Sequence, residues 1–299
     1  METIGNGTFF SCTGLTNVTL PHSVTLIEPN AFNGCSNLKR ITLSNSLKTI
    51  GNYTFYGCTN LEGIVIPSSV TRIGFYILLG CTNLANLAVE EGNGMYDSRE
   101  NCNAIIETSN NRLILGCKNS VIPNGVTTIA GYSFDNCIGL TCIAIPASVT
   151  SIEGDAFGEC INLSDVYCFG EQLPTAESSA FSYSPVANMT LHVPAGALET
   201  YKVTEPWSTF GDIVALTEEE LNALTPAASM KWLVETLAGG VISLQGATEN
   251  VPVAVYTTSG YKVASGVATP DEALVLHTGL ATGDVAIVTI GEKSVKVVF

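Results

Sequence analysis

Cysteines and histidines are the residues of this chain best suited to metal binding or nucleophilic chemistry. It has ten cysteines, and six of them recur at a spacing of 23 residues in two series, which are Cys12, Cys35, Cys58 and Cys81, and then Cys137 and Cys160. The three histidines, His22, His192 and His277, stand far apart. A metal site needs clustered ligands such as C-x-x-C, and the sequence has none. We therefore expect no metal and no cofactor, and a structural or surface role for each histidine.

Carboxylates are the one set of candidate catalytic residues. The sequence contains no H-E-x-x-H, G-x-S-x-G or P-loop string. Asp97, Glu100 and Glu107 lie close together in sequence, within residues 90–125, and could supply the carboxylate pair that a glycan-active enzyme needs. This remains a minor alternative, and we expect the chain not to be an enzyme.

Charge and hydropathy exclude two further classes of protein. The net charge is −15, with 12 basic residues, so the chain cannot neutralise the phosphates of a nucleic acid. The mean hydropathy is +0.32, yet no run of about 18 apolar residues occurs, so we expect no transmembrane segment. Glu2 follows Met1 with no apolar stretch behind it, so no signal peptide is visible. We expect a leader to have been removed and the protein to be extracellular or at the cell surface.

The elements that must position these side chains repeat every 23 residues. Isoleucine keeps one position at Ile4, Ile27, Ile50, Ile73, Ile129 and Ile152. Phenylalanine keeps another at Phe9, Phe32, Phe55, Phe134 and Phe157, with Leu78 as the exception. Leucine keeps a third at Leu15, Leu38, Leu61, Leu84, Leu140 and Leu163. No single coil can bury these side chains alone, so the coils must stack and share one core.

One coil shows how its strand is oriented. Ile64 and Ile66 are expected to point inward by strand alternation, and Val65 outward. Pro67 has no N–H group and ends the strand. Phe55 is expected to fill the centre of the coil from a turn or short helix.

The repeat resembles a known family. Residues 145–163 read IPASVTSIEGDAFGECINL, which is similar to the BspA-like leucine-rich repeats of bacterial surface proteins. The resemblance covers roughly residues 1–215. It implies a fold between α/β and mainly β, a leucine-rich-repeat solenoid with a short parallel sheet. It also implies a role in adhesion to host matrix or to other cells.

Two departures from the repeat are expected within the solenoid domain, residues 1–215, and a helix and linker follow it. Residues 90–125 predict an enlarged coil with a β-hairpin turning at 109–111. A C-terminal cap is expected at about 170–215, with 191–194 as the last strand, a short helix at 195–202, and Trp207 and Phe210 sealing the open end. Residues 216–240 are interpreted as a helix and linker, beginning at a capping box of Thr217 and Glu220.

A small antiparallel β-sandwich is expected at 241–299, since short strand patterns alternate with turn signals such as Ser259-Gly260. Residues 255–263 and the end of the chain resemble the sorting domain of type IX secretion. Thr257 and Tyr261 depart from that pattern, and a purely structural sandwich is the alternative.

The cysteines are expected to be free thiols. Side chains of the repeated cysteines point inward in parallel, so a bridge would distort the packing. Cys168 occupies an inward slot and should be buried, whereas Cys142 occupies an outward slot and is the candidate for an exposed thiol. Cys102 and Cys117 flank the hairpin, and a disulfide between them is the alternative.

The proposed function rests on the outward strand positions, which vary between repeats while the inward ones do not. The candidate binding face consists of Thr16, Asn17, Lys39, Arg40, Thr42, Glu62, Asn86, Asp165 and Tyr167. We expect a non-catalytic surface or secreted protein that binds a protein or glycan ligand, host matrix among them, and no nucleic acid. The alternative is a structural spacer for a domain upstream.

Overall fold

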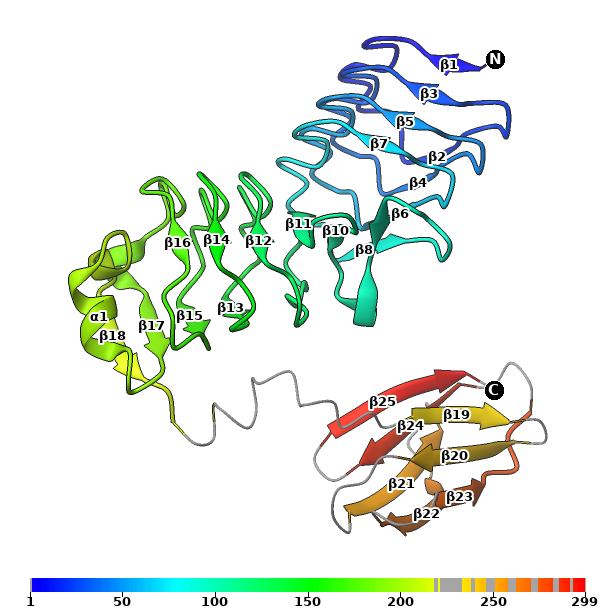
Figure 1. Cartoon of the computed structure of the whole chain (residues 1–299). Coiled ribbons are helices and arrows are strands. Elements are labelled where there is room, and N and C mark those ends of the chain that lie inside the picture. The colour runs from blue at the N-terminus through cyan, green and yellow to red at the C-terminus, as the bar shows by residue number, and fades with distance from the viewer. Residues whose placement is uncertain are drawn as a thin grey trace. The chain divides into compact units, whose positions relative to one another are not determined.

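The protein is described from a computed structural model, shown in Figure 1. It describes residues 2–217, 220, 233–237, 240–245, 251–257, 262–269, 274–281, 285–290 and 293–298. The chain forms two compact units, residues 1–225 and 226–299.

The first four coils of the first unit stack in register and form two parallel sheets. The two-residue strands are β1 (Thr3–Ile4), β3 (Leu26–Ile27), β5 (Thr49–Ile50) and β7 (Arg72–Ile73), paired in that order. The other sheet, named here the strand face, consists of β2 (Asn17–Thr19), β4 (Arg40–Thr42), β6 (Gly63–Ile66) and β8 (Asn86–Val89). Between these sheets each coil turns through an arm of successive turns, named here the aromatic arm because it carries the repeated phenylalanine.

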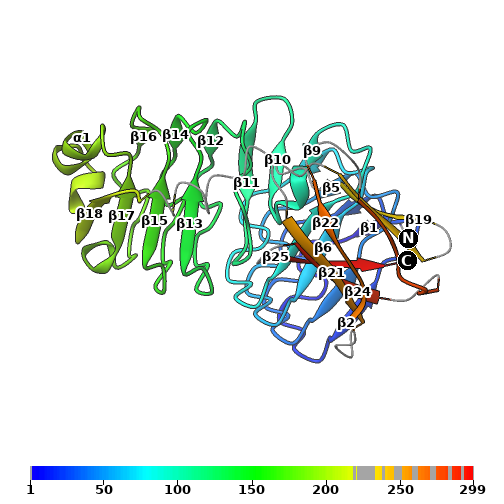
Figure 2. The same cartoon turned by 90° about the horizontal axis from the view of Figure 1, so that it is seen from below.

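The later coils form a second pair of sheets, seen side by side in Figure 2. One contains, in spatial order, β16 (Thr175–Ala176), β14 (Ser151–Ile152), β12 (Thr128–Ile129), β11 (Arg112–Leu115), β10 (Ile105–Glu107) and β9 (Tyr96–Asp97). The other contains β13 (Cys142–Ile145), β15 (Asp165–Cys168), β17 (Thr190–Val193) and β18 (Asp212–Ala215). Both sheets are parallel apart from the pairings of β10.

Stacked phenylalanines confirm the predicted register. Phe32 lies between Phe9 and Phe55, with ring centroids 5.0 and 5.6 Å apart. Ile64 and Ile66 are buried on the inward side of β6, while Val65 is 51% exposed. The solenoid and its parallel sheets are therefore as the sequence predicts, and the phenylalanines project from turns.

The core divides into two clusters, one in each half of the solenoid. The first extends from Ile4 to Cys117, and the second from Cys102 to Phe210. The predicted hairpin lies at this junction, where β10 pairs antiparallel with β11. The sequence predicted one enlarged coil here, and the structure shows more than that. An enlarged coil is followed by a short one, because Leu113 pairs with Ile129 only 16 positions later in place of 23.

The C-terminal cap matches its prediction with one correction. Helix α1 (Leu198–Val203) lies in the predicted place, and Trp207 and Phe210 are buried. Residues 191–194 are not the last strand, however, because β18 pairs in parallel with β17 and extends the sheet by one strand. The backbone after the helix thus completes one more pairing than the decaying repeat indicates. Short 3₁₀ turns lie at Arg99–Asn101, Val186–Asn188 and Trp207–Thr209.

The second unit consists of two small antiparallel sheets. One contains β19 (Leu233–Leu237), β20 (Val241–Gln245) and β23 (Leu274–His277). The other contains β22 (Lys262–Ala268), β21 (Val251–Thr257), β24 (Val285–Ile290) and β25 (Lys293–Val298). Ile242 and Val255, one from each sheet, belong to the same buried cluster, as in a sandwich.

The connection between the units is described only in part. Thr217 and Glu220 form the predicted capping box, in which the Glu220 amide donates to Thr217 Oγ1 at 3.2 Å. The rest of the predicted helix, and the turn at Ser259-Gly260, lie outside the described residues. Strand β19 falls inside the range 216–240 that was interpreted as helix and linker. Among the described residues, no helix has the length and apolarity to cross a membrane.

Candidate functional site

Seven of the nine predicted binding residues lie on or next to the strand face. Asn17, Arg40, Gly63 and Asn86 are consecutive partners across its four strands. All seven side chains are exposed, and these residues are Thr16, Asn17, Lys39, Arg40, Thr42, Glu62 and Asn86. The structure therefore brings them together on one surface.

Opposite charges lie beside each other on this surface. Arg40 Nη2 lies 3.5 Å from Glu62 Oε2, and the two side chains are 77% and 50% exposed. An ion pair exposed to this extent contributes little to stability, so both groups remain available to a ligand. Together with Thr42, Val65 and Asn86 they line a shallow groove of about 530 Å³.

Asp165 and Tyr167 lie on a different sheet, on β15, and so do not extend the strand face. Tyr167 stacks on His192 with ring centroids 4.2 Å apart. His192 Nε2 lies 3.2 Å from Asp165 Oδ1, and His192 Nδ1 lies 2.9 Å from Glu220 Oε1. Hydrogen bonds from Ser164 and His192 lower the pKa of Asp165. These groups connect the last coils to the segment at Glu220.

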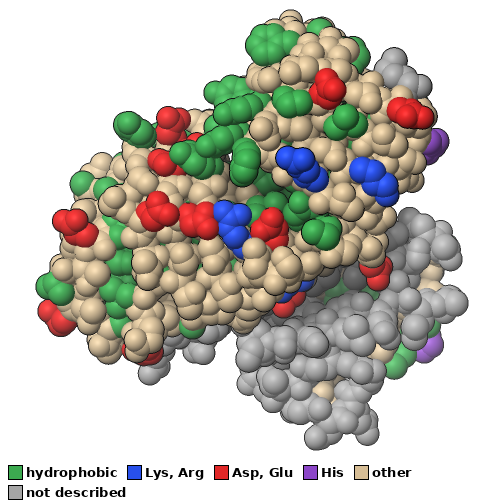
Figure 3. Space-filling view, turned by 45° about the horizontal axis from the view of Figure 1, so that its top comes forward, with side chains coloured by type: hydrophobic (Ala, Val, Ile, Leu, Met, Phe, Trp, Pro, Cys, Tyr) green, Lys and Arg blue, Asp and Glu red, His purple; other side chains and the backbone are tan. Residues whose placement is uncertain are grey.

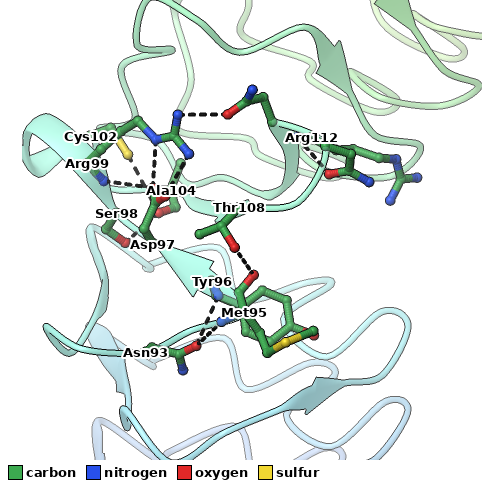
Figure 4. A network of polar contacts seen from close by, with 12 residues as sticks. Asn93, Met95, Tyr96, Asp97, Ser98, Arg99, Cys102, Ala104, Thr108 and Arg112 are labelled. Carbon is green, nitrogen blue, oxygen red and sulfur yellow. Dashed lines mark hydrogen bonds and ion pairs between the residues drawn. The ribbon is translucent and has the colours of Figure 1, made fainter.

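Asp97, one of the three carboxylates of the hairpin coil, lies in a network of polar contacts (Figure 4). Asp97 is held by Arg99, whose Nη2 and Nε lie 2.6 and 2.9 Å from the two carboxylate oxygens. Burial raises the pKa of Asp97, but the hydrogen bonds from Arg99 outweigh it and leave the pKa lowered. Glu100 is exposed, and of the three only Glu107 lines the cavity described below.

All ten cysteines are free, as predicted, and Cys102 and Cys117 are not bridged. Cys142 is exposed and Cys168 is buried, also as predicted. The repeated thiols donate hydrogen bonds to the phenylalanine carbonyl of the preceding coil, as Cys58 does to Phe32 at 3.2 Å. Burial raises the pKa of Cys58 to about 12, so its thiol stays protonated. Within the described residues, no three metal-ligating side chains are grouped.

A cavity lies where the short coil interrupts the aromatic arms. Eight positions separate Ile129 from Cys137, but only four separate Leu113 from Cys117. The coil of β11 therefore has no aromatic arm. A Cβ at Gly116 would collide with the Phe134 ring, so the chain there passes directly under the next arm. The space left by the missing arm is named here the notch, and its volume is about 330 Å³.

Aromatic side chains border the notch. Tyr76 comes from the arm before it and Tyr132 from the arm after it, and their ring centroids are 4.8 Å apart. Tyr53 stacks on Tyr76 at 5.1 Å, and Phe75 is 74% exposed. Figure 3 shows hydrophobic side chains gathered beside a hollow in this face, with acidic and basic side chains next to them. Exposed aromatic groups around a recess are typical of a ligand site.

Ionisable groups form the rest of the lining. Arg112 Nη2 and Nε lie 2.6 and 3.0 Å from the two carboxylate oxygens of Glu153, and Arg112 Nη1 lies 3.9 Å from Glu107. The hydrogen bonds from Arg112 lower the pKa of Glu153. Burial, and then the negative charges of Glu159 and Asp155, raise the pKa of Asp135 to about 6.

The sequence contains a signal for the notch. Leu113, Cys117, Ile122-Pro123 and Val126 preserve the residue types of the repeat at shortened intervals. The expectation of one enlarged coil over residues 90–125 therefore did not include the missing arm.

Comparison with known proteins identifies the repeat. A family model described as a BspA type leucine-rich repeat region matches residues 1–110 and 113–201 in six copies. No match is found among curated proteins.

Several solved structures of low sequence identity are similar. One is a leucine-rich cell surface protein from Faecalibacterium prausnitzii, with 24% identity and a TM-score of 0.49 over 75% of this chain and 66% of that chain. A second is the pneumococcal vaccine antigen PcpA, with 16% identity and a TM-score of 0.40 over 68% of each chain. A third is a leucine-rich repeat protein from Eubacterium ventriosum, with 21% identity and a TM-score of 0.41 over 72% of this chain and 70% of that chain.

The chain thus spans just under two thirds of the Faecalibacterium protein. The family model matches more than half of this chain, and its copies coincide with the stacked coils. The chain belongs to the BspA-type leucine-rich repeat family.

Proposed function

We propose that this protein is a non-catalytic binding protein, extracellular or at the cell surface, which presents the strand face to a protein or glycan ligand such as host matrix. The observation that carries the proposal is the alternation of buried and exposed side chains along each strand. In β4, Ile41 is buried between exposed Arg40 and Thr42, and β6 repeats the arrangement with Ile64 inward and Val65 outward. Inward positions preserve the core, and outward positions are free to differ.

The charges of the strand face indicate what it can select. Lys39 and Arg40 are exposed side by side on a chain whose net charge is −15. A local basic site on an acidic protein favours an acidic patch of a ligand, because the rest of the surface repels it. Adhesion is the role that the resemblance to BspA-like proteins suggests for such a face.

The test is binding of the full chain to an array of immobilised matrix proteins and glycans. Lys39→Glu with Arg40→Glu should weaken binding to an acidic ligand at least tenfold, because attraction becomes repulsion. Lys48→Glu with Arg72→Glu makes the same charge change at exposed positions, Lys48 next to β5 and Arg72 in β7, and serves as the matched control. Equal binding by both double variants would remove the strand face from the proposal.

A further inference from the structure

The notch exposes backbone groups that form hydrogen bonds between neighbouring arms elsewhere in the solenoid. In the first three arms and in the arm of Phe157, three amides of each arm donate to three carbonyls of the next, and in the arm of Phe134 two do. Phe55 donates to Ile77 at 2.9 Å, and Gly57 donates to Leu79 at 2.8 Å. The equivalent amides of the arm bordering the notch belong to Tyr76, Leu78 and Gly80, and no acceptor for them is found in the described part of the chain.

The opposite wall presents the complementary groups. The carbonyl of Ser133 accepts from the Gly116 amide at 2.8 Å. The carbonyls of Gly131 and Asp135, which would serve the missing arm in the same way, receive no donor from the described residues. The hydroxyl of Ser133 is also buried without a hydrogen-bond partner. Donors and acceptors therefore face each other across a recess bordered by aromatic rings.

We propose that the notch is a binding site for a neutral glycan. The faces of Phe75, Tyr76 and Tyr132 can stack against the C–H face of a sugar ring. Sugar hydroxyls both donate and accept, so they can pair with the amides on one wall and with the carbonyls and carboxylates on the other. A volume of about 330 Å³ admits one or two sugar rings rather than a protein domain.

The charges of the notch exclude other ligands. Glu107, Asp135 and Glu153 stand against one cation, Arg112, so an anionic sugar would be repelled. A cation such as a quaternary ammonium group suits the aromatic rings and carboxylates, but it has no acceptor for the unpaired amides.

An extended peptide could replace the missing arm and use the same amides. To do so it would have to part the rings of Tyr76 and Tyr132, which touch across the notch. A glycan needs no such rearrangement.

The site adds a second binding surface to the proposed function and does not depend on the strand face.

The experiment measures binding of the full chain to immobilised neutral oligosaccharides of glucose, galactose, mannose, xylose and N-acetylglucosamine by biolayer interferometry. At least one should bind, and Phe75→Ala and Tyr132→Ala should each weaken it at least tenfold. Phe75→Trp should retain binding, because the larger ring preserves the stacking surface. A uronic acid version of the bound oligosaccharide should bind at least tenfold more weakly.

Tyr183→Ala is the matched control. Tyr183 is 86% exposed and has a φ of 59°, close to the 62° of Tyr132. Substitution by alanine should therefore affect the backbone similarly at both positions, although only Tyr132 borders the notch. The strand-face variant Lys39→Glu with Arg40→Glu should bind the oligosaccharide normally, which separates this site from the proposed function.

Four outcomes would overturn the inference. One is that none of the neutral oligosaccharides binds. A second is that binding survives Phe75→Ala and Tyr132→Ala, or falls equally with Tyr183→Ala. The third is that these variants lose binding to an extended peptide from a displayed library while no oligosaccharide binds. Shortened oligosaccharides after incubation would show catalysis and contradict a site that only binds.

Discussion

At the scale of single residues, the side chains that repeat have one role each. Cys35, Cys58, Cys81 and Cys160 all donate to the phenylalanine carbonyl of the preceding coil, 26 positions back in sequence. Ser184 takes the same place one coil later and donates to the Phe157 carbonyl at 2.7 Å. The cysteine position therefore requires a small buried hydrogen-bond donor, and a hydroxyl also meets this requirement.

Asp135 is the residue whose ionisation works against folding. Its pKa is raised from 3.8 to about 6 by burial and neighbouring carboxylates, so the folded state binds a proton more readily than the unfolded state. Its contribution therefore weakens stability as the pH rises from about 4 to 6, and the full penalty is present at pH 7.

Asp135→Asn removes that penalty. After allowance for solvent screening of a half-exposed group, the free energy of unfolding should rise by about 1 kcal/mol at pH 7 and hardly change at pH 4. Urea denaturation at both pH values measures it, with the exposed Asp212→Asn as control. The same gain at pH 4 and pH 7 would contradict the assignment.

At the scale of elements, the buried phenylalanines connect one coil to the next. Phe32 is fully buried and stacks on Phe9 and Phe55. Phe32→Ala should lower the free energy of unfolding by about 3–5 kcal/mol, because it leaves a cavity between two coils. Denaturant titration checks this, and the neighbouring Phe10→Ala, at a 58% exposed side chain, should cost less than about 0.5 kcal/mol. Similar losses for the two variants would show that the stack is not what holds the coils.

The sequence predicted the elements where the 23-residue frame is intact. Ile64 inward and Val65 outward follow from strand alternation alone, and hairpin β10–β11 follows from its turn residues. The 23-residue spacing is lost between Leu113 and Ile129, because this coil is shorter although it keeps the residue types of the repeat. The notch depends on which arms become neighbours after that change, so local patterns could not reveal it. The strand-face residues were predictable as a set, whereas the placement of Asp165 and Tyr167 on another sheet was not.

At the scale of the whole repeat unit, the short coil divides the solenoid into two halves with separate cores. The strand of the strand face is missing from that coil too, since five positions separate Cys117 from Ile122, against eight between Cys58 and Ile66. The two outward sheets are therefore separate, and coupling between the halves runs through β10 and β11 and the contact of Tyr76 with Tyr132.

Stability in stacked repeats is carried by contacts between neighbours, so an interruption should weaken cooperativity. Phe32→Ala should speed native-state amide hydrogen exchange more in residues 2–90 than in 128–215, and Phe157→Ala should do the reverse. Mass spectrometry of peptides from the full chain measures both. Uniform acceleration along 2–215 by either variant would show that the halves unfold as one.

The missing arm also shows how a recess can arise in a repeat protein. A solenoid that grows by copying whole units produces smooth, continuous surfaces, because every copy covers the one before it. Here a spacing between Leu113 and Cys117 that is four residues shorter than in a full repeat leaves main-chain groups of the neighbouring arms uncovered. One shortened copy is thus enough to form a preorganised polar cleft in a stack of repeats.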